Sequence, residues 1–362
     1  MKFLKIINIL LLNIFFLFLG IIILEIIFGK WFSKNNYGNL LIPRYSTATI
    51  DNPPYNSERN YIYTRDKNGF RANNYNLDEV DILIIGGSTT EERDVDDNLI
   101  WTKVFEREIS KKKDLQVLNA GIGGQTSYEH GVMFELWFAR FKELKPKYIL
   151  IYLGMNDALN LLEGLDSRKL IIKNRKFLRG TNKDELINTE KTDQLIQFIK
   201  NNSAIHLLYL ILRSNYISSK HNTKYGEHSD YIKLNMINKQ TENKNISSKK
   251  LKINQKYLFE FMKLYENNLI EIINRSKEKS AEPFFITQIV ADHHVLHPYL
   301  QLINQQTIKT CNEKKIICFK LHEKIKFYKE IDFYDDTHTS PSGSEKVGKL
   351  VAELFLKHKF NN

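Results

Sequence analysis

Short aliphatic runs recur along this sequence, and segments with helical spacing separate them. The aliphatic runs lie at residues 80–85, 115–118, 148–153, 283–290 and 315–321. Short apolar runs bounded by turn residues are typical of strands that are buried on both faces of a parallel sheet. Helical spacing is found at residues 99–109, 128–144, 300–310 and 347–357. Strands that alternate with helices in this way predict an α/β domain in which helices cover both faces of a mainly parallel sheet.

A long apolar segment lies at the N-terminus. Residues 3–28 are nearly all apolar and are interrupted by Lys5, Asn8, Asn13 and Glu25. A helix of this length can cross a hydrocarbon core of ~30 Å. A cleavable signal peptide would have a shorter apolar stretch and a small-residue cleavage site, and neither is evident here. We therefore expect residues 1–34 to form a single-pass transmembrane anchor, with a buried core helix as the alternative.

The residues around this helix bear on its orientation. Lys2 and Lys5 precede the uncharged stretch at residues 14–24, whereas Lys30 and Lys34 follow it, so the flanking charges do not decide the topology. The short leading tail and the long following domain favour a domain that lies outside the cytoplasm. We therefore expect a membrane protein whose catalytic part is periplasmic or extracellular, with membrane lipid as the partner of the helix.

The remaining sequence divides by composition. Residues 35–79 are rich in Asn, Tyr, Pro and Asp without a clear period, which predicts a connecting segment that wraps onto the main domain at residues 80–362. Residues from about 160 to 250 break the alternation of strands and helices and are predicted to be an insertion. The apolar block at residues 204–212 within it is too short to span a bilayer. A buried helix, a lid and a membrane-contacting surface are the alternatives for this block.

The charge and the cysteines exclude several kinds of site. The formal net charge is +11, but the Lys residues are scattered and no basic motif is interleaved with aromatic residues, so no nucleic-acid partner is expected. Cys311 and Cys318 form neither a C-x-x-C motif nor a zinc-finger pattern. Cys318 lies in an apolar run and is predicted to be a core residue, while a disulfide between the two thiols stays open.

Three polar or glycine-rich segments directly follow predicted strands. They are Gly86-Gly87-Ser88-Thr89, the segment at residues 119–126 and Gly154-Met155-Asn156-Asp157. Ligands bind at the carboxyl ends of the strands in open α/β sheets, and glycines let backbone amides approach a ligand closely. Each segment alone also fits an ordinary turn or helix cap. The G-x-x-x-x-G-K-[ST] and G-x-G-x-x-G spacings of phosphate-binding loops are absent.

A fourth segment, Asp335-Asp336-Thr337-His338, lies near the carboxyl end of the sequence. Ser340 and Pro341 predict the start of the last helix, so His338 lies on the loop that leads into it. A carboxylate three residues before an imidazole can orient the ring and stabilise its charged form. On its own, a D-x-x-H pattern is common by chance.

A cluster of histidines raises the alternative of a metal site. Asp292, His293, His294 and His297 follow the fourth predicted strand, and three histidines with a carboxylate are able to bind zinc. No H-E-x-x-H helix motif is present, and Pro298 interrupts the spacing. We favour a polar loop at the mouth of a pocket and expect no metal.

Taken together, the four segments change this interpretation. In this order they resemble the blocks of the SGNH (GDSL-type) hydrolase superfamily across residues 80–350, with residues 160–250 unmatched. Asn68-Gly69-Phe70-Arg71, together with the Gly-Gly-Ser-Thr block, is similar to membrane-anchored members. The resemblance implies a flavodoxin-like, three-layer α/β/α domain.

The resemblance also implies a role for each of five residues. Ser88 would be the nucleophile, His338 the general base and Asp335 the group that orients it. The backbone N–H groups of Ser88 and Gly124 and the side-chain amide of Asn156 would form the oxyanion hole. The first block of the superfamily usually reads Gly-Asp-Ser, and here Gly87 stands in place of the Asp. Any support from that carboxylate is therefore missing.

These residues predict serine-dependent hydrolysis of an ester through an acyl-serine intermediate. The expected substrate is a lipid, an O-acetylated glycan or another ester of the cell envelope, and the chemistry requires no cofactor. An O-acyltransferase would use the same residues with a glycan hydroxyl in place of water. A catalytically silent, membrane-tethered binding protein on the same fold is the remaining alternative.

Overall fold

The computed structural model describes most of the chain outside the predicted insertion. The described residues are 2–29, 31–32, 42, 46–50, 55, 60–73, 75–164, 199, 202–206, 208–209, 254–291, 294–335 and 337–360. The predicted insertion at about residues 160–250 and the first half of the connecting segment therefore lie mostly outside the described residues.

Five parallel strands form the central sheet in the order β4-β3-β5-β6-β7. The strands are β3 (Val80–Gly86), β4 (Gln116–Asn119), β5 (Tyr148–Tyr152), β6 (Glu282–Ile286) and β7 (Ile317–Phe319). This is the flavodoxin-like order, in which the first strand of the sheet lies between the second and the third. The predicted α/β class with a mainly parallel sheet is confirmed.

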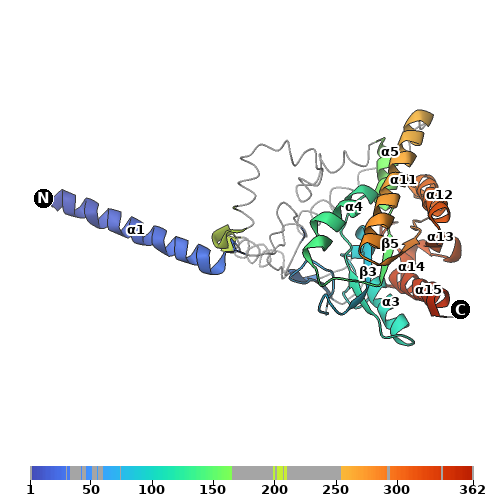
Figure 1. Ribbon diagram of the computed structural model, residues 1–362, viewed down its shortest axis with the longest axis horizontal. Coiled ribbons are helices and arrows are strands. Elements are labelled where there is room, and N and C mark those ends of the chain that lie inside the picture. The colour runs from blue at the N-terminus through green and yellow to red at the C-terminus, as the bar shows by residue number, and fades with distance from the viewer. Residues whose placement is uncertain are drawn as a thin grey trace.

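Helices cover both faces of this sheet because its strands are apolar on both sides. Leu83 and Ile85 of β3 belong to one core cluster, whereas Ile82 and Ile84 belong to the other. One face is covered by α4 (Ser127–Leu136), α5 (Met155–Glu163), α11 (Gln255–Glu278) and α12 (His297–Lys314). The other face is covered by α3 (Trp101–Ser110) and α15 (Pro341–Phe360). The predicted three-layer α/β/α arrangement is therefore confirmed (Figure 1).

Several predicted element boundaries are wrong. The strand predicted at residues 283–290 ends at Ile286, because the side chain of Asn304 bonds the backbone N–H and C=O of Gln288 in place of a neighbouring strand. The helix predicted at residues 128–144 ends at Leu136, and the 3₁₀ turn η1 (Phe138–Arg140) follows. The strand predicted at residues 315–321 covers only Ile317–Phe319, and α13 (Leu321–Lys324) and α14 (Lys329–Asp332) follow it.

A two-stranded antiparallel sheet precedes the domain and was not predicted. It pairs β1 (Ser46–Ile50) with β2 (Tyr61–Arg65). In β2, Tyr61, Tyr63 and Arg65 are all buried, and a buried arginine breaks the apolar alternation by which a strand is recognised. The segment after β2 joins the main sheet, since the Arg71 N–H donates to the Asn119 carbonyl at 2.9 Å.

The N-terminal helix α1 (Lys2–Phe28) extends away from the α/β domain (Figure 1). Its segment Lys5–Phe28 has 24 residues and a mean hydropathy of 2.9, and none of it is buried against other parts of the described chain. At 1.5 Å per residue, such a helix is about 36 Å long. By length and composition, α1 is therefore a candidate transmembrane span.

Two buried helix glycines differ in what surrounds them. A Cβ atom at Gly348 of α15 would lie 2.5 Å from Val104 Cβ and 2.6 Å from the Trp101 carbonyl of α3. A Cβ atom at Gly131 of α4 would meet Glu271 Cγ at 3.6 Å, which is ordinary contact. The absence of a side chain is therefore required for packing at Gly348 but not at Gly131.

The two glycines give opposite predictions. Gly348→Ala should lower the free energy of unfolding by ~1–3 kcal/mol, because the new methyl group forces α15 away from α3. Gly131→Ala should leave it unchanged or raise it by up to ~1 kcal/mol, because alanine is the better helix former. Urea unfolding of the detergent-solubilised chain measures both, and equal effects would contradict the close packing of α15 on α3.

The buried Glu92 joins the end of α2 (Ser88–Glu91) to the beginning of α15. Its carboxylate accepts hydrogen bonds from Thr339 Oγ1 at 2.7 Å, Ser344 Oγ at 2.5 Å and the Trp101 N–H at 2.5 Å. Burial raises the pKa of Glu92 to about 7, because these neutral donors only partly offset the loss of water. The buried Asp157 behaves similarly, and burial raises its pKa to about 7.

A raised carboxyl pKa makes stability depend on pH. The folded chain holds the Glu92 proton up to a pH of about 7, whereas the unfolded chain loses it above 4.5. The contribution of Glu92 to stability is therefore complete below pH 4.5, declines between these values and is lost above about 7. Glu92→Gln should reduce the fall in the free energy of unfolding over this pH range by about 3 kcal/mol, because each pKa unit corresponds to ~1.4 kcal/mol. Part of the pH dependence should remain in Glu92→Gln, because Asp157 is still present. The measurement is the free energy of unfolding from pH 4 to 8, and an equal fall in the wild type and in Glu92→Gln would contradict this assignment.

Candidate active site

Ser88 is the first residue of α2 and is separated from the end of β3 only by Gly87. Its Oγ lies 2.7 Å from His338 Nε2, although the two residues are 250 positions apart in the sequence. On the far side of the imidazole, His338 Nδ1 lies 2.7 Å from Asp335 Oδ2 and 2.9 Å from Oδ1. When Nδ1 carries the proton and its N–H donates a hydrogen bond to the carboxylate, Nε2 is left as the acceptor for the Ser88 hydroxyl.

The loop around His338 is held by its own backbone and by the same carboxylate. The His338 N–H donates to Asp335 Oδ1 at 2.7 Å, so Asp335 fixes the backbone as well as the ring. The Tyr334 N–H donates to the His338 carbonyl at 3.1 Å, and the Tyr334 ring lies nearly parallel to the imidazole with centroids 5.8 Å apart. The His338 side chain is nevertheless 26% exposed, so a substrate can reach the ring.

The loop after β4 and the start of α5 come next to Ser88. Gly124 has a φ of +79°, a left-handed conformation that glycine adopts without strain. Asn156 Nδ2 donates to the Gln125 carbonyl at 2.9 Å, which leaves the second N–H of this amide for another acceptor. A Cβ atom at Gly87 would lie 3.0 Å from Asn156 Nδ2, so the amide lies directly beside the residue that precedes Ser88. The structure therefore brings Ser88, His338, Asp335 and Asn156 together, with the Gly124 loop beside them.

Asp157 fixes the position of this loop relative to α5. Its carboxylate accepts from the Ser127 N–H at 3.0 Å and from Ser127 Oγ at 2.7 Å. Thr126 and Glu129 form a capping box at the start of α4. The chain on the carboxyl side of Gly124 is consequently tied to α5, the helix that carries Asn156.

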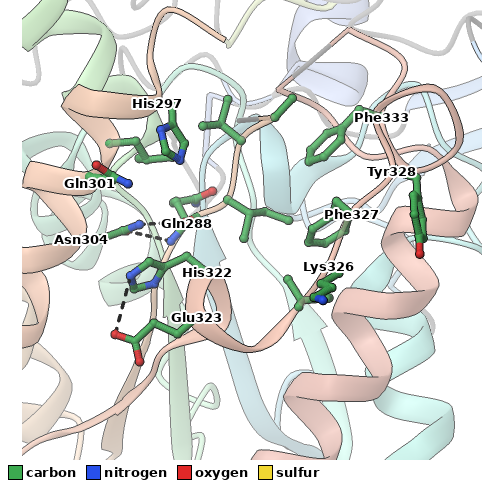
Figure 2. Close-up of a pocket in the computed structure, with 15 residues that line it drawn as sticks. Gln288, His297, Gln301, Asn304, His322, Glu323, Lys326, Phe327, Tyr328 and Phe333 are labelled. Atoms are coloured by element: carbon green, nitrogen blue, oxygen red, sulfur yellow. Dashed lines mark hydrogen bonds and ion pairs between the residues drawn. The ribbon is translucent and has the colours of Figure 1, made fainter. Parts of the chain in front are cut away.

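A cavity of about 590 Å³ lies at the carboxyl ends of β6 and β7 (Figure 2). None of Ser88, Gly124, Asn156, Asp335 and His338 lines it. His297, Gln301 and His322 line one side, and Phe327 and Phe333 line the opposite side.

Two lining residues connect the cavity walls to the candidate active site. Gln288 Nε2 donates to Thr89 Oγ1 at 3.1 Å and to the Tyr152 carbonyl at 3.0 Å. Phe333 pairs through its backbone with Thr339, the residue after His338. Both walls are therefore attached to neighbours of Ser88 and His338.

The structure describes two of the four candidate metal ligands, His294 and His297. Asp292 and His293 are outside the described residues, His294 Nδ1 accepts from the Leu296 N–H at 3.2 Å, and His297 lines the cavity. Cys311 and Cys318 are free thiols. Within the described part of the chain, no group of three His, Cys, Asp or Glu side chains is placed to hold a metal ion.

Several residues around the site were not predicted from the sequence. They are Arg65, Glu91, Glu92, Gln288 and Tyr334. Glu91 and Glu92 were within reach, since they follow the Gly-Gly-Ser-Thr block by two and three residues. Arg65, Gln288 and Tyr334 have no local pattern that would single them out.

The chain is similar to several known proteins. A family model described as GDSL-like lipase/acylhydrolase matches residues 82–351. The chain is 36% identical over 78 residues to the uncharacterized lipoprotein YqeF of Bacillus subtilis, a match that spans 22% of this chain and 30% of that relative.

Solved structures of low identity align over most of the chain. A member of the lipolytic G-D-S-L family from Veillonella parvula aligns at 12% identity with a TM-score of 0.43, over 77% of this chain and 99% of its own. An acetylxylan esterase from Geobacillus stearothermophilus aligns at 11% identity with a TM-score of 0.42, over 77% and 93% of the two chains. Since the family model spans the chain from β3 to α15, this protein belongs to the GDSL-like lipase/acylhydrolase family of ester-hydrolysing enzymes.

Proposed function

We propose that the protein hydrolyses an ester of the cell envelope through an acyl-serine intermediate formed on Ser88. The observation that carries this proposal is the continuous hydrogen-bonded series from Ser88 Oγ through the His338 ring to Asp335, with both links at 2.7 Å. A serine hydroxyl is a weak nucleophile until an adjacent base takes its proton, and this geometry supplies that base.

In the proposed reaction, Ser88 Oγ attacks the ester carbonyl carbon while His338 Nε2 takes the hydroxyl proton. Negative charge then develops on the carbonyl oxygen, where the N–H groups of Ser88 and Gly124 and the Asn156 amide donate hydrogen bonds. Loss of one such donor typically costs ~3 kcal/mol of barrier. His338 returns the proton to the departing alcohol. A water molecule then attacks the carbonyl carbon of the acyl-serine while His338 takes a proton from it, and that proton passes to Ser88 Oγ as the acid is released. Asp335 keeps the ring in the tautomer that both proton transfers require.

We also propose the location and organisation of the chain. Residues 1–34 anchor it in a membrane, residues 35–79 connect the anchor to the domain, and residues 80–362 form the hydrolase domain with an insertion at about 160–250. The exposed, apolar helix α1 supports the anchor. The lipoprotein name of the relative YqeF is in keeping with an envelope location. We place the domain on the periplasmic or extracellular side, where lipid esters and acetylated glycans are available.

The cavity at the ends of β6 and β7 offers a place to bind part of an envelope ester. An ester whose carbonyl lies at Ser88 carries a second portion that needs a place to bind. The cavity offers hydrogen-bonding side chains on one wall and phenyl rings on the other, which suits a portion that has both polar and apolar surfaces. We propose that it receives the part of the ester remote from the reacting carbonyl.

The assignment of Ser88 and His338 is tested by hydrolysis of p-nitrophenyl acetate in detergent. Ser88→Ala and His338→Ala should each lower kcat by at least ~10³-fold, because the nucleophile or its base is removed. A fluorophosphonate probe should label the wild-type chain at Ser88 and leave Ser88→Ala unlabelled. Wild-type rates in Ser88→Ala would refute the proposal. Labelling without hydrolysis, together with acyl transfer to an added sugar, would identify the acyltransferase instead.

The role of the cavity is tested on the exposed face of α12. Gln301→Trp places an indole at the cavity wall, whereas Gln305→Trp adds the same group to the same helix at a position that does not line the cavity. Gln301→Trp should raise KM several-fold for esters with a bulky alcohol or a long acyl chain, and leave kcat/KM for p-nitrophenyl acetate within about twofold. Equal KM values in the two variants for every bulky ester would exclude the cavity as a substrate site.

A further inference from the structure

Glu91 is the last residue of α2 and lies three positions after Ser88. Its side chain is only 1% exposed. Burial alone would raise the pKa of this carboxyl, but the neighbouring Arg65 and Arg93 and the hydrogen bonds from Arg65 and Tyr63 outweigh it and hold the pKa below its usual value. The four-residue helix that carries the candidate nucleophile thus ends in a buried, ionised carboxylate.

The partner of this carboxylate comes from β2, outside the five-stranded sheet. Arg65 Nη2 lies 3.0 Å from Glu91 Oε1, and the arginine side chain has no exposed surface. Its other two nitrogens also donate, Nη1 to the Gly69 carbonyl at 2.6 Å and Nε to the Tyr63 hydroxyl at 2.6 Å. The guanidinium is therefore fixed in position and orientation by acceptors on several sides.

Both members of the pair also hold the loop that leads to Gly124. Arg65 Nη2 donates to the Gly121 carbonyl at 2.7 Å. Glu91 Oε2 accepts from the Gly123 N–H at 2.6 Å. Arg65 thus binds the carbonyl of the residue before Ile122, and Glu91 binds the N–H of the residue after it.

This loop also lies directly against the backbone of α2. A Cβ atom at Gly121 would lie 2.4 Å from the Glu91 backbone nitrogen and 2.7 Å from the Thr90 carbonyl carbon. Asn119 Nδ2 donates to the Thr90 carbonyl at 2.8 Å, while its Oδ1 accepts from the Gly121 N–H at 2.8 Å. The helix α2 and the loop after β4 are therefore packed as one unit. Gly124 directly follows Gly123, whose N–H is bonded to Glu91.

We propose that Arg65 and Glu91 are positioning residues that fix the Gly124 N–H at a set distance from the Ser88 hydroxyl. This inference rests on the proposed function, because the distance matters only if a carbonyl oxygen becomes charged between these groups. Hydrogen-bond donors stabilise developing charge best when they are already in place before the reaction. A displacement of ~1 Å can cost ~100-fold in rate. The segment before the hydrolase domain thereby supplies a residue on which the oxyanion hole depends.

The test uses the full chain in detergent, with p-nitrophenyl acetate as substrate and an alkyl trifluoromethyl ketone as an inhibitor that forms a tetrahedral adduct. Glu91→Gln replaces the acceptor for Gly123 with an amide, and Arg65→Lys keeps the charge but not the planar set of donors. Each should lower kcat ~10–100-fold with KM within about twofold, and weaken the inhibitor by the same factor as kcat/KM.

Tyr63→Phe is the matched control. It removes the hydroxyl that donates to Glu91 Oε1 at 2.9 Å and accepts from Arg65, but it removes no contact to residues 121–124. It should lower Tm to a degree comparable with the other two variants while kcat stays within about twofold. A loss of kcat that simply follows the loss of Tm across all three variants would show a merely structural role and overturn the proposal.

A further variant keeps the proposal testable if an ion-pair variant does not fold. Gly121→Ala leaves Arg65 and Glu91 intact but pushes the loop away from α2, and should lower kcat and inhibitor affinity in parallel. Wild-type kcat in a folded Glu91→Gln or Gly121→Ala chain would overturn the positioning role alone, provided that Ser88→Ala is inactive. Full activity of Ser88→Ala would overturn the proposed function and this inference with it.

Discussion

The pairing of β3 between β4 and β5 is the constraint on which the rest of the site depends. All three strands are parallel, so their carboxyl ends meet at one edge, and each is followed by a loop that carries one part of the site. Ser88 follows β3, Gly124 follows β4 and Asn156 follows β5. His338 arrives from the opposite end of the sheet, on the segment between β7 and α15. The sheet order therefore brings three of these residues together, and the segment between β7 and α15 brings His338 to Ser88.

Much of this arrangement could be predicted, because the information is local. Each buried strand has its own aliphatic run, and the loop that follows it can be inspected directly in the sequence. The ends of β6 and α4 could not be predicted, since Asn304 replaces the ladder at Gln288 and Trp137 docks on Phe70 and Asn68. Arg65 was missed for the same physical reason: its partners at Gly121 and Glu91 are far along the chain, and no short pattern records such a contact.

Two adjacent glutamates show how strongly partners decide the state of a buried acid. Both side chains are buried, yet burial raises the pKa of Glu92 to about 7 while the pKa of Glu91 is held low. The difference lies in their partners, because Glu91 has a guanidinium beside it and Glu92 accepts mainly from hydroxyls and one amide. One side of α2 is thus fixed by an ion pair to the N-terminal segment, and the other by neutral hydrogen bonds to the His338 loop.

The 250-residue separation of Ser88 and His338 also orders events during biogenesis. A ribosome makes the helix α1 and the Ser88 turn long before it makes the segment that supplies the imidazole. A nascent chain therefore contains Ser88 without the imidazole that lies 2.7 Å from its hydroxyl until His338 has been synthesised. The hydrogen-bonded series from Ser88 through His338 to Asp335 can therefore form only after the segment between β7 and α15 has been synthesised.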